Sequence, residues 1–327
     1  MTVTTLPRLG FLGVGWIGRN RMEALTREGL AEVAALADPQ AEALATAAEA
    51  APAAERAATL EELLERDLDG VVIATPSALH AEQAIVALER GLAVFCQKPL
   101  ARDAEETRRV LAAARAADRL LDVDLSYRHV EALRAARRLV ESGAIGRLHS
   151  LDLAFHNAYG PDKAWFTDPE LAGGGCLIDL GTHLVDLALW LTGAAEVAVE
   201  TARTLSLRGH AVEDQASAVL TLGEVRAQLA CSWFQPAGGE CAFECTAWGS
   251  EGAVSVRNVG GSFYDFRAEL WRGTSSETLV EPPDAWGGLA IAAWAQRLAA
   301  DRSYEPAAEE LELLARTIDD VYAEAGR

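Results

Sequence analysis

Residues 8 to about 125 alternate short apolar runs with longer, alanine-rich amphipathic segments. Parallel strands are buried on both faces and need a helical crossover between them, so they produce this alternation. The apolar runs are 9–13, 33–37, 70–74, 93–96 and 120–123. The segments between them carry apolar residues at helical spacing and are 21–28, 40–51, 79–90 and 104–117. The pattern predicts a doubly wound parallel sheet.

Beyond a helix expected at 131–142, the pattern changes to strands with alternating apolar residues. The strands are expected at 148–155, 197–205, 216–222, 225–234, 242–248 and 253–259. Tight turns between them favour antiparallel neighbours. Residues 286–299 and 307–324 are again expected to be helical, and the last helix is a candidate to pack back on the first domain. We expect domains at 1–124 and 125–327, since 327 residues that are 50% apolar suffice for two cores.

The charge balance excludes several partners. The 29 Lys and Arg residues oppose 49 Asp and Glu residues, which gives a formal net charge of −20. Nucleic acid and anionic membrane surfaces are therefore poor partners. We expect no apolar stretch of the roughly 20 residues that a membrane span requires. The first residues also lack a secretory pattern, and we expect a cytoplasmic protein.

Cysteines and acidic residues do not form a recognisable metal site. The cysteines are odd in number and scattered, which predicts free thiols at Cys96, Cys176, Cys231, Cys241 and Cys245. Asp179, His183 and Asp186 recur on one face of a helix, but neither a His-Glu-x-x-His run nor a second clustered histidine accompanies them. We therefore expect no bound metal.

A glycine-rich turn follows the first apolar run and leads into a helix. Gly13, Gly15 and Gly18, with Trp16 and Ile17 between them, match the pattern that brings backbone close to a pyrophosphate. The helix N-terminus then offers its amides and partial positive charge to the phosphates. The sequence therefore predicts a dinucleotide cofactor.

Asp38 ends the second apolar run, 20 residues after Gly18, at the distance expected for a carboxylate that binds a ribose diol. A helix cap before Pro39 is the alternative. Because this carboxylate would repel a 2′-phosphate and no arginine adjoins it, NAD is favoured over NADP. Thr75 and Pro76, at the end of the third run, either line the cofactor or form a simple turn.

Proton-transfer groups are expected at two places. Gly173-Gly174-Gly175 precedes Asp179 and His183, whose spacing of four places both on one helix face. An imidazole titrates near neutrality and suits a general acid or base, although a core histidine after a flexible loop is the alternative. Lys98 follows the fourth apolar run, where it is either a group over the cofactor or a solvated surface charge.

Taken in order, these motifs resemble the glucose-fructose oxidoreductase and inositol dehydrogenase (Gfo/Idh/MocA) family over nearly the whole chain. The resemblance implies a Rossmann domain followed by an α/β domain, whose large, mostly antiparallel open sheet forms a dimer or tetramer interface. It makes Lys98, Asp179 and His183 the catalytic residues. His183 would be the general acid or base, Lys98 would hydrogen-bond the reacting hydroxyl, and Asp179 would position the substrate.

The same resemblance implies two sets of binding residues. The cofactor set is Gly13, Gly15, Trp16, Ile17, Gly18, Asp38, Thr75, Pro76, Gln97 and Lys98. The substrate set is Lys98, Tyr127, Arg128, Tyr159, Trp165, Asp179 and His183. Phe166 and Trp233 are further candidates to stack on a sugar ring, although packing in the core is the alternative for each aromatic residue.

The chain departs from the family at Gln97-Lys98-Pro99, since the family's tripeptide is Glu-Lys-Pro. The change removes a negative charge beside Lys98, and we expect it to shift the pH optimum without abolishing catalysis.

The resemblance implies an NAD-dependent oxidoreductase that interconverts a secondary alcohol and a ketone on a sugar, amino sugar or cyclitol. A lyase or glycosidase that oxidises its substrate transiently, and a non-catalytic NAD-binding regulator, are the alternatives. The sequence specifies neither the sugar nor the carbon oxidised.

Overall fold

The computed structural model describes residues 6–283 and 286–326. The chain divides into two compact units, one of residues 1–124 and 287–312, the other of residues 125–286 and 313–327. The first division coincides with the boundary expected after residue 124. Residues 287–312 differ from expectation, since the sequence places them in the second domain and the structure packs them with the first unit.

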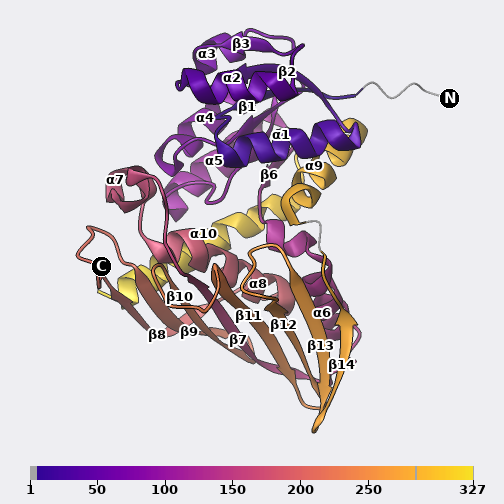
Figure 1. Cartoon of the computed structure of the whole chain (residues 1–327), viewed down its shortest axis with the longest axis vertical. Coiled ribbons are helices and arrows are strands. Elements are labelled where there is room, and N and C mark those ends of the chain that lie inside the picture. Colours follow the sequence, from indigo (N-terminus) through magenta and orange to yellow (C-terminus); the bar gives the residue numbers. More distant parts are fainter. Residues whose placement is uncertain (1–5, 284–285, 327) are drawn as a thin grey trace, which may run out of the picture. The chain divides into compact units, whose positions relative to one another are not determined.

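The first unit contains a six-stranded parallel sheet in the order β3-β2-β1-β4-β5-β6 (Figure 1). Its strands are β1 (Arg8–Leu12), β2 (Glu32–Ala37), β3 (Glu55–Ala57), β4 (Gly70–Ile73), β5 (Ala93–Cys96) and β6 (Leu121–Val123). Its helices are α1 (Trp16–Glu28), α2 (Ala41–Ala50), α3 (Leu60–Leu63), α4 (Ser77–Glu89), α5 (Ala104–Ala117) and α9 (Leu289–Ala300). The predicted doubly wound sheet is confirmed.

The order of strands reverses between β1 and β4, where the chain crosses from one half of the sheet to the other. In open parallel sheets, ligands bind at the carboxyl ends of the strands next to such a switch point. The segments that follow β1, β4 and β5 are those in which the sequence places Gly13, Thr75 and Lys98. The topology therefore brings the expected cofactor residues to one edge of this sheet.

Helix α9 completes the core of the first unit. Trp294 is fully buried, and its ring lies 5.5 Å from that of Phe95 on β5. A Cβ atom at Gly70 would lie 3.0 Å from the Trp294 ring, so β4 accommodates the indole by lacking a side chain there. The amphipathic pattern of α9 indicates that it packs on a core but not on which core, and for this reason the sequence-based domain bounds and the compact units differ at this helix.

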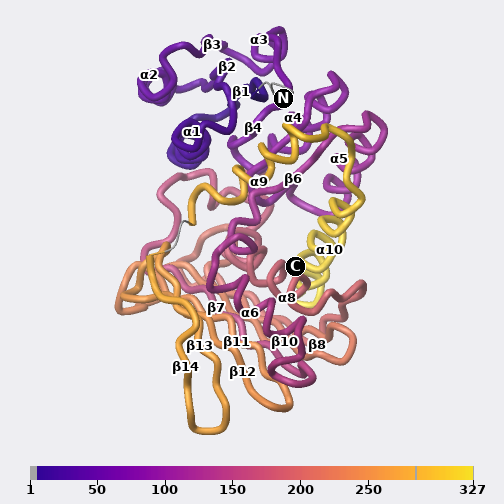
Figure 2. Tube along the Cα trace, turned by 90° about the vertical axis from the view of Figure 1, so that its right-hand side faces the viewer, coloured from indigo at the N-terminus to yellow at the C-terminus, as the bar shows by residue number. Residues whose placement is uncertain are grey.

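The second unit contains an eight-stranded sheet in the order β14-β13-β12-β11-β7-β10-β9-β8, whose strands are labelled in Figure 1 and whose chain trace is drawn from the side in Figure 2. Its strands are β7 (Leu148–Asn157), β8 (Ala198–Leu205), β9 (Gln215–Leu222), β10 (Val225–Ser232), β11 (Cys241–Gly249), β12 (Ala253–Asn258), β13 (Phe266–Arg272) and β14 (Ser275–Val280). Among the described strands of this sheet, only β7 and β10 pair in parallel, so the predicted mostly antiparallel sheet is confirmed. The sequence reasoning missed β13 and β14.

Helices α6 (Glu131–Glu141) and α8 (Thr182–Thr192) cover one face of this sheet. Aromatic rings from the strands and from Tyr127 fill the layer between them. The Tyr127 ring stacks on Phe243 at 5.1 Å and meets Phe155 and Phe266 edge-on, each at 5.8 Å. Burial raises the pKa of the Tyr127 phenol well above its ordinary value, which keeps it neutral.

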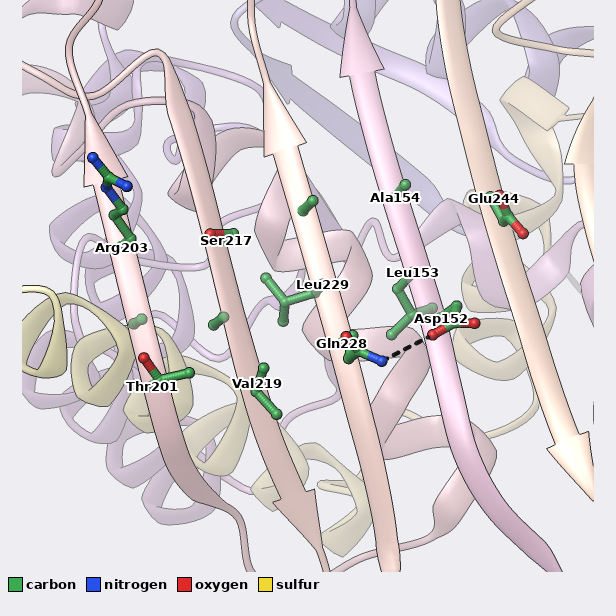
Figure 3. Close-up of a pocket in the computed structure, with 13 residues that line it drawn as sticks. Asp152, Leu153, Ala154, Thr201, Arg203, Ser217, Val219, Gln228, Leu229 and Glu244 are labelled. Carbon is green, nitrogen blue, oxygen red and sulfur yellow. Dashed lines mark hydrogen bonds between the residues drawn. The ribbon is translucent and has the colours of Figure 1, made fainter.

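Polar side chains from several strands line a hollow on this sheet (Figure 3). Asp152 on β7, Arg203 on β8, Ser217 on β9 and Gln228 on β10 contribute to it, and the Gln228 amide donates to Asp152 at 3.5 Å. The resemblance assigns the open face of this sheet to contact with other copies of the chain.

One helical run is long and apolar enough to cross a bilayer by length and composition, which corrects the expectation that no stretch reaches that limit. The run is Pro169–Thr192, made of α7 (Pro169–Ala172), a π-helical turn (Leu177–Gly181) and α8, and 89% of its apolar window is buried inside the protein. Its apolar character is that of a core helix. The five cysteines are free, as predicted, and the structure also shows that all five are buried.

His80, on α4, connects two of the segments at the edge of the first sheet. It is 1% exposed, and its ring nitrogens lie 2.7 Å from the carbonyl oxygens of Thr75 and Pro99. Burial lowers the pKa of the His80 imidazole, the Lys98 ammonium lowers it further, and hydrogen bonds to the two carbonyls oppose both effects. The neutral ring donates to one carbonyl and packs against the other, so His80 links the segments that follow β4 and β5.

We predict that His80 makes the first unit acid-sensitive. Because its pKa is lower in the folded chain than the ordinary value of about 6.5, the unfolded chain binds more protons below that pH. Stability is then lost as the pH falls through the window below about 6.5, with a slope approaching 1.4 kcal/mol per pH unit. Thermal unfolding at pH 7.5 and pH 5.5 should show a larger drop in Tm for the wild type than for His80→Gln. A smaller drop in the wild type would mean that an imidazolium binds both carbonyls.

Candidate functional site

The glycine-rich turn between β1 and α1 excludes side chains for geometric reasons. Gly13 has a φ of +83°, and a Cβ atom there would lie 2.5 Å from the Ala74 carbonyl oxygen. A Cβ atom at Gly18 would lie 2.0 Å from the Gly13 carbonyl oxygen. Gly15 is the N-cap of α1 and has no side chain to accept from the first amides of the helix. The N–H groups of these amides can donate hydrogen bonds to a phosphate group.

The two residues between these glycines are accessible. Trp16 is the first residue of α1 and is 52% exposed, and Ile17 is partly exposed. Trp16 follows directly on Gly15 of the glycine-rich turn. Its position is compatible with contact to a bound cofactor.

Asp38 braces the same turn. One carboxylate oxygen accepts from the Val14 amide at 2.8 Å, and the other accepts from the Gln40 amide at 2.8 Å. The N-cap of α2 is Gln40, so Asp38 is not the helix cap that formed the alternative interpretation. A negative charge therefore stands next to the glycine-rich turn, where the sequence placed a ribose-binding group.

Thr75 and Pro76 follow β4 and are both partly exposed. The Thr75 hydroxyl donates to the Gln83 side-chain oxygen at 2.6 Å, and Pro76 is the N-cap of α4. Both the lining role and the simple turn are compatible with this arrangement.

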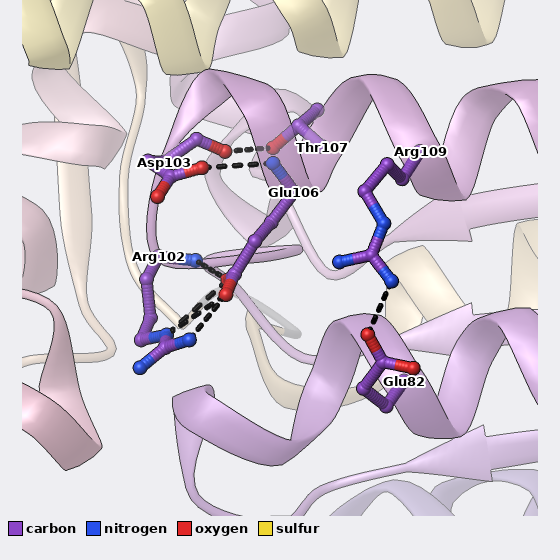
Figure 4. Close-up of polar contacts among 6 residues, drawn as sticks. All are labelled: Glu82, Arg102, Asp103, Glu106, Thr107 and Arg109. Carbon is purple, nitrogen blue, oxygen red and sulfur yellow. Dashed lines mark hydrogen bonds and ion pairs between the residues drawn. The ribbon is translucent and has the colours of Figure 1, made fainter.

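Lys98 lies in the segment between β5 and α5, and the Lys98-Pro99 peptide bond is cis. Its ammonium-bearing side chain is partly exposed, whereas Gln97 before it is buried. Reciprocal caps fix the start of α5 (Figure 4): Asp103 accepts from the Glu106 amide at 2.8 Å, and Glu106 accepts from the Arg102 amide at 3.0 Å. The segment that carries Lys98 is thus held where it joins the helix.

Lysine is rare in this chain. It occurs only at Lys98 and Lys163, whereas 27 arginines supply the other basic side chains. Arginine is a fixed, delocalised cation, while the lysine ammonium is a compact donor that can also give up a proton. This chain uses arginine for nearly all of its positive charges but has a lysine at the edge of the sheet. The choice of lysine there argues against a solvated surface charge with no specific role.

In the second unit, Asp179 lies in the π-helical turn and His183 lies one turn later, in α8. The Trp233 indole nitrogen donates to an Asp179 carboxylate oxygen at 2.9 Å. The expected spacing assumed a regular α-helix, whereas the π turn changes the angle at which Asp179 leaves the helix. Such turns are often found at functional sites.

His183 is 7% exposed and packs against the aromatic layer. Its ring lies 4.8 Å from the Tyr127 ring, edge-on, and 6.3 Å from that of Phe155.

Arg128 forms an ion pair with Asp186 at 2.6 Å, and Asp186 is 1% exposed. Tyr127 and Arg128, which the resemblance assigns to substrate, thus contact the helix of His183. Asp186, one of the three residues considered above as metal ligands, is therefore already paired with Arg128. The described residues contain no group of His, Cys, Asp or Glu side chains that could hold a metal ion.

Glu213 fixes the entry to this helix and was missed by the sequence reasoning. One of its carboxylate oxygens accepts from the amides of Gly175 and Leu177 and from the Tyr322 hydroxyl, each at 2.9 Å. A Cβ atom at Gly175 would lie 1.9 Å from the Glu213 carbonyl oxygen. Gly175 is therefore required by its close packing against Glu213.

The predicted aromatic residues divide into two groups. Trp165 stacks on Phe166 at 3.8 Å, and Phe166 meets Trp233 edge-on at 6.4 Å. Since Trp233 donates to Asp179, these three rings form a contiguous group next to that carboxylate. Tyr159 is 56% exposed and lies 6.1 Å from Phe263. An acid flanked by aromatic rings is a suitable surface for a polyhydroxylated ring.

Comparison with known proteins supports the resemblance in both halves of the chain. Residues 7–125 match the oxidoreductase family with an NAD-binding Rossmann fold, and residues 133–255 match the GFO/IDH/MocA C-terminal domain. A 1,5-anhydro-D-fructose reductase from Ensifer adhaerens is 31% identical over 78% of this chain and 77% of its own length.

Two further relatives bear on the ligands of the family. A levoglucosan dehydrogenase from Pseudarthrobacter phenanthrenivorans is 39% identical over 39% of this chain, and that match spans only 34% of the relative. The crystal structure of KijD10, a 3-ketoreductase from Actinomadura kijaniata in complex with NADP and TDP-benzene, is 26% identical. Its TM-score is 0.86, and the alignment covers 98% of each chain. With both domains matched in order, the chain belongs to the GFO/IDH/MocA family of oxidoreductases.

Proposed function

We propose that the protein interconverts a secondary alcohol and a ketone on a sugar, amino sugar or cyclitol with NAD. The observation that carries this proposal is the lysine at the carboxyl edge of the Rossmann sheet, in a chain with only two lysines. Family membership and the Asp179–Trp233 pair in the second unit support it.

The proposed roles follow from the chemistry of each side chain. Bound NAD would accept the hydride from the alcohol carbon. A ring nitrogen of His183 would take the hydroxyl proton during oxidation and return it during reduction. The Lys98 ammonium would donate a hydrogen bond to the reacting oxygen, where negative charge develops. Asp179 would accept from a neighbouring substrate hydroxyl, with Trp233 fixing the orientation of its carboxylate.

Asp38 supports NAD as the cofactor rather than NADP. Both of its oxygens accept from backbone amides beside the glycine-rich turn, so its negative charge is held in place. A 2′-phosphate near this carboxylate would be repelled, and no arginine follows Asp38 directly. The NADP complex of KijD10 shows that a structural neighbour takes the phosphorylated cofactor, so the preference is specific to this chain's own residues.

We also propose a cytoplasmic homodimer or homotetramer that assembles through the open face of the second sheet. The hollow lined by Arg203, Ser217 and Gln228 gives this face both donors and acceptors for a second copy. Burial of the apolar helical run and of all five thiols supports the location.

We predict that a sugar and cyclitol panel will contain a substrate that reduces NAD. Replacing His183 by Asn should lower kcat by about 10²- to 10⁴-fold, because proton transfer loses its positioned base. Absorbance of NADH measures the turnover, and NADH fluorescence titration checks that the cofactor still binds. His149→Asn is the matched control, since His149 is exposed. Product formation without net NADH would instead indicate transient oxidation, and full activity of His183→Asn would exclude the proposed role.

We predict that Asp38→Asn will raise the NADP to NAD ratio of kcat/KM by at least about tenfold, or about 1.4 kcal/mol. The amide oxygen can still accept from Val14, so that bond to the turn remains, while the repulsive charge and the bond from the Gln40 amide are lost. Asp67→Asn, at a 95% exposed side chain of the same unit, is the control. An unchanged ratio would show that Asp38 does not select the cofactor.

We predict that Trp233→Phe will lower kcat/KM for the sugar by about tenfold, since a hydrogen bond to a charged group is lost. NADH binding should stay unchanged because Trp233 belongs to the second unit. Trp271→Phe removes a comparable indole bond, to Glu269 at 3.2 Å, and should leave activity intact. Equal effects of the two variants would remove Trp233 from the proposed site.

A further inference from the structure

Three buried polar side chains meet beneath the segment that carries Lys98. Arg21 on α1, Gln97 after β5 and Asp124 after β6 are 2%, 8% and 1% exposed. The Arg21 Nε donates to Asp124 Oδ2 at 2.5 Å, and the Gln97 amide nitrogen donates to the same oxygen. Arg21 also donates to the Asn20 side-chain oxygen at 2.7 Å and to the Gly287 carbonyl oxygen.

The strand register explains how these residues meet. Cys96 pairs with Val123 in the parallel ladder of β5 and β6, so the next residues, Gln97 and Asp124, emerge side by side. The Asp124 amide donates to the Cys96 carbonyl oxygen at 2.9 Å and extends the ladder by one bond. Asp124 is therefore adjacent to the residue that precedes Lys98.

The chemistry of each member depends on the others. A carboxylate as buried as Asp124 needs an opposite charge and hydrogen-bond donors, and Arg21 and Gln97 provide these. The negative charge of Asp124 also acts on the last residue of β5, because burial and the Asp124 carboxylate both raise the pKa of the Cys96 thiol. A glutamate at position 97 has no proton to donate and would bring a second carboxylate to one guanidinium. Position 97 must be a donor as long as position 124 is a carboxylate.

We propose that Gln97 and Asp124 are positioning residues that act as a matched amide and carboxylate, paired with Arg21, to fix the backbone from which Lys98 extends. The pair also connects Lys98 to α1, whose first amides are suited to a phosphate. This inference rests on the proposed function only in giving Lys98 a role in turnover; the geometry around Lys98 can be tested without it.

The test exchanges the two groups. Gln97→Glu brings two carboxylates together, Asp124→Asn leaves Arg21 without its carboxylate, and the double variant restores one amide and one carboxylate. We expect Gln97→Glu to lose about 10²-fold in kcat through displacement of Lys98, and the double variant to recover at least tenfold. Gln296→Glu, the same change at an exposed position of α9, is the control and should keep wild-type activity. Should Gln97→Glu fail to fold, Gln97→Met removes the donor without adding charge.

A second readout follows Lys98 directly. Because the chain has two lysines, ¹³C-dimethylation labels only Lys98 and Lys163 besides the N-terminal amine, and a Lys163→Arg variant assigns the two lysine signals. The Lys98 signal should move in Gln97→Glu and return toward its wild-type position in the double variant, while the Lys163 signal stays fixed. A Lys98 signal unchanged in every variant, or a double variant no better than Gln97→Glu, overturns the proposal. If the wild type oxidises no sugar while the Lys98 signal behaves as expected, only the proposed function fails.

Discussion

A buried polar group that loses its partner costs more free energy than its hydrogen bond contributes on balance, so such groups hold their surroundings in one arrangement. Three of them control the segments that carry the proposed chemistry. His80 bridges the loops after β4 and β5, Asp124 holds Gln97, and Glu213 fixes the start of the helix that bears Asp179. The apolar cores determine where the sheets lie, while these groups determine the backbone paths at their edges.

Periodicity could predict most of the fold because burial on both faces leaves a direct trace in the sequence. All four residues of β4 and of β5 are buried, and these strands coincide with the predicted apolar runs. β14 was missed for the opposite reason, since its first four residues are exposed and polar. The short β3 has one buried residue among three, which is too little for a recognisable pattern.

The site was predictable where the chemistry is local. The glycine-rich turn and Asp38 lie within 26 residues of one another, and the structure shows the Asp38 carboxylate bonded to the turn. Glu213 and Tyr322 are 109 residues apart, and Arg21 and Asp124 are 103 apart. No spacing rule connects residues at such distances, because the connection arises only when the sheets assemble. The π turn was equally hidden, since a spacing of four residues looks the same in either type of helix.

The change from a family glutamate to Gln97 takes on a different meaning once the partners are known. From the sequence, the substitution removes a negative charge beside Lys98. In the structure a carboxylate is present one strand away, on Asp124, and the Gln97 amide donates to it. Arg21 compensates the charge of Asp124 within the same cluster, so the neighbourhood of Lys98 retains a paired acid and base. What distinguishes this chain is therefore the position of the negative charge, which lies on Asp124 and not on residue 97. Arg21 binds this carboxylate from α1, the helix that follows the glycine-rich turn.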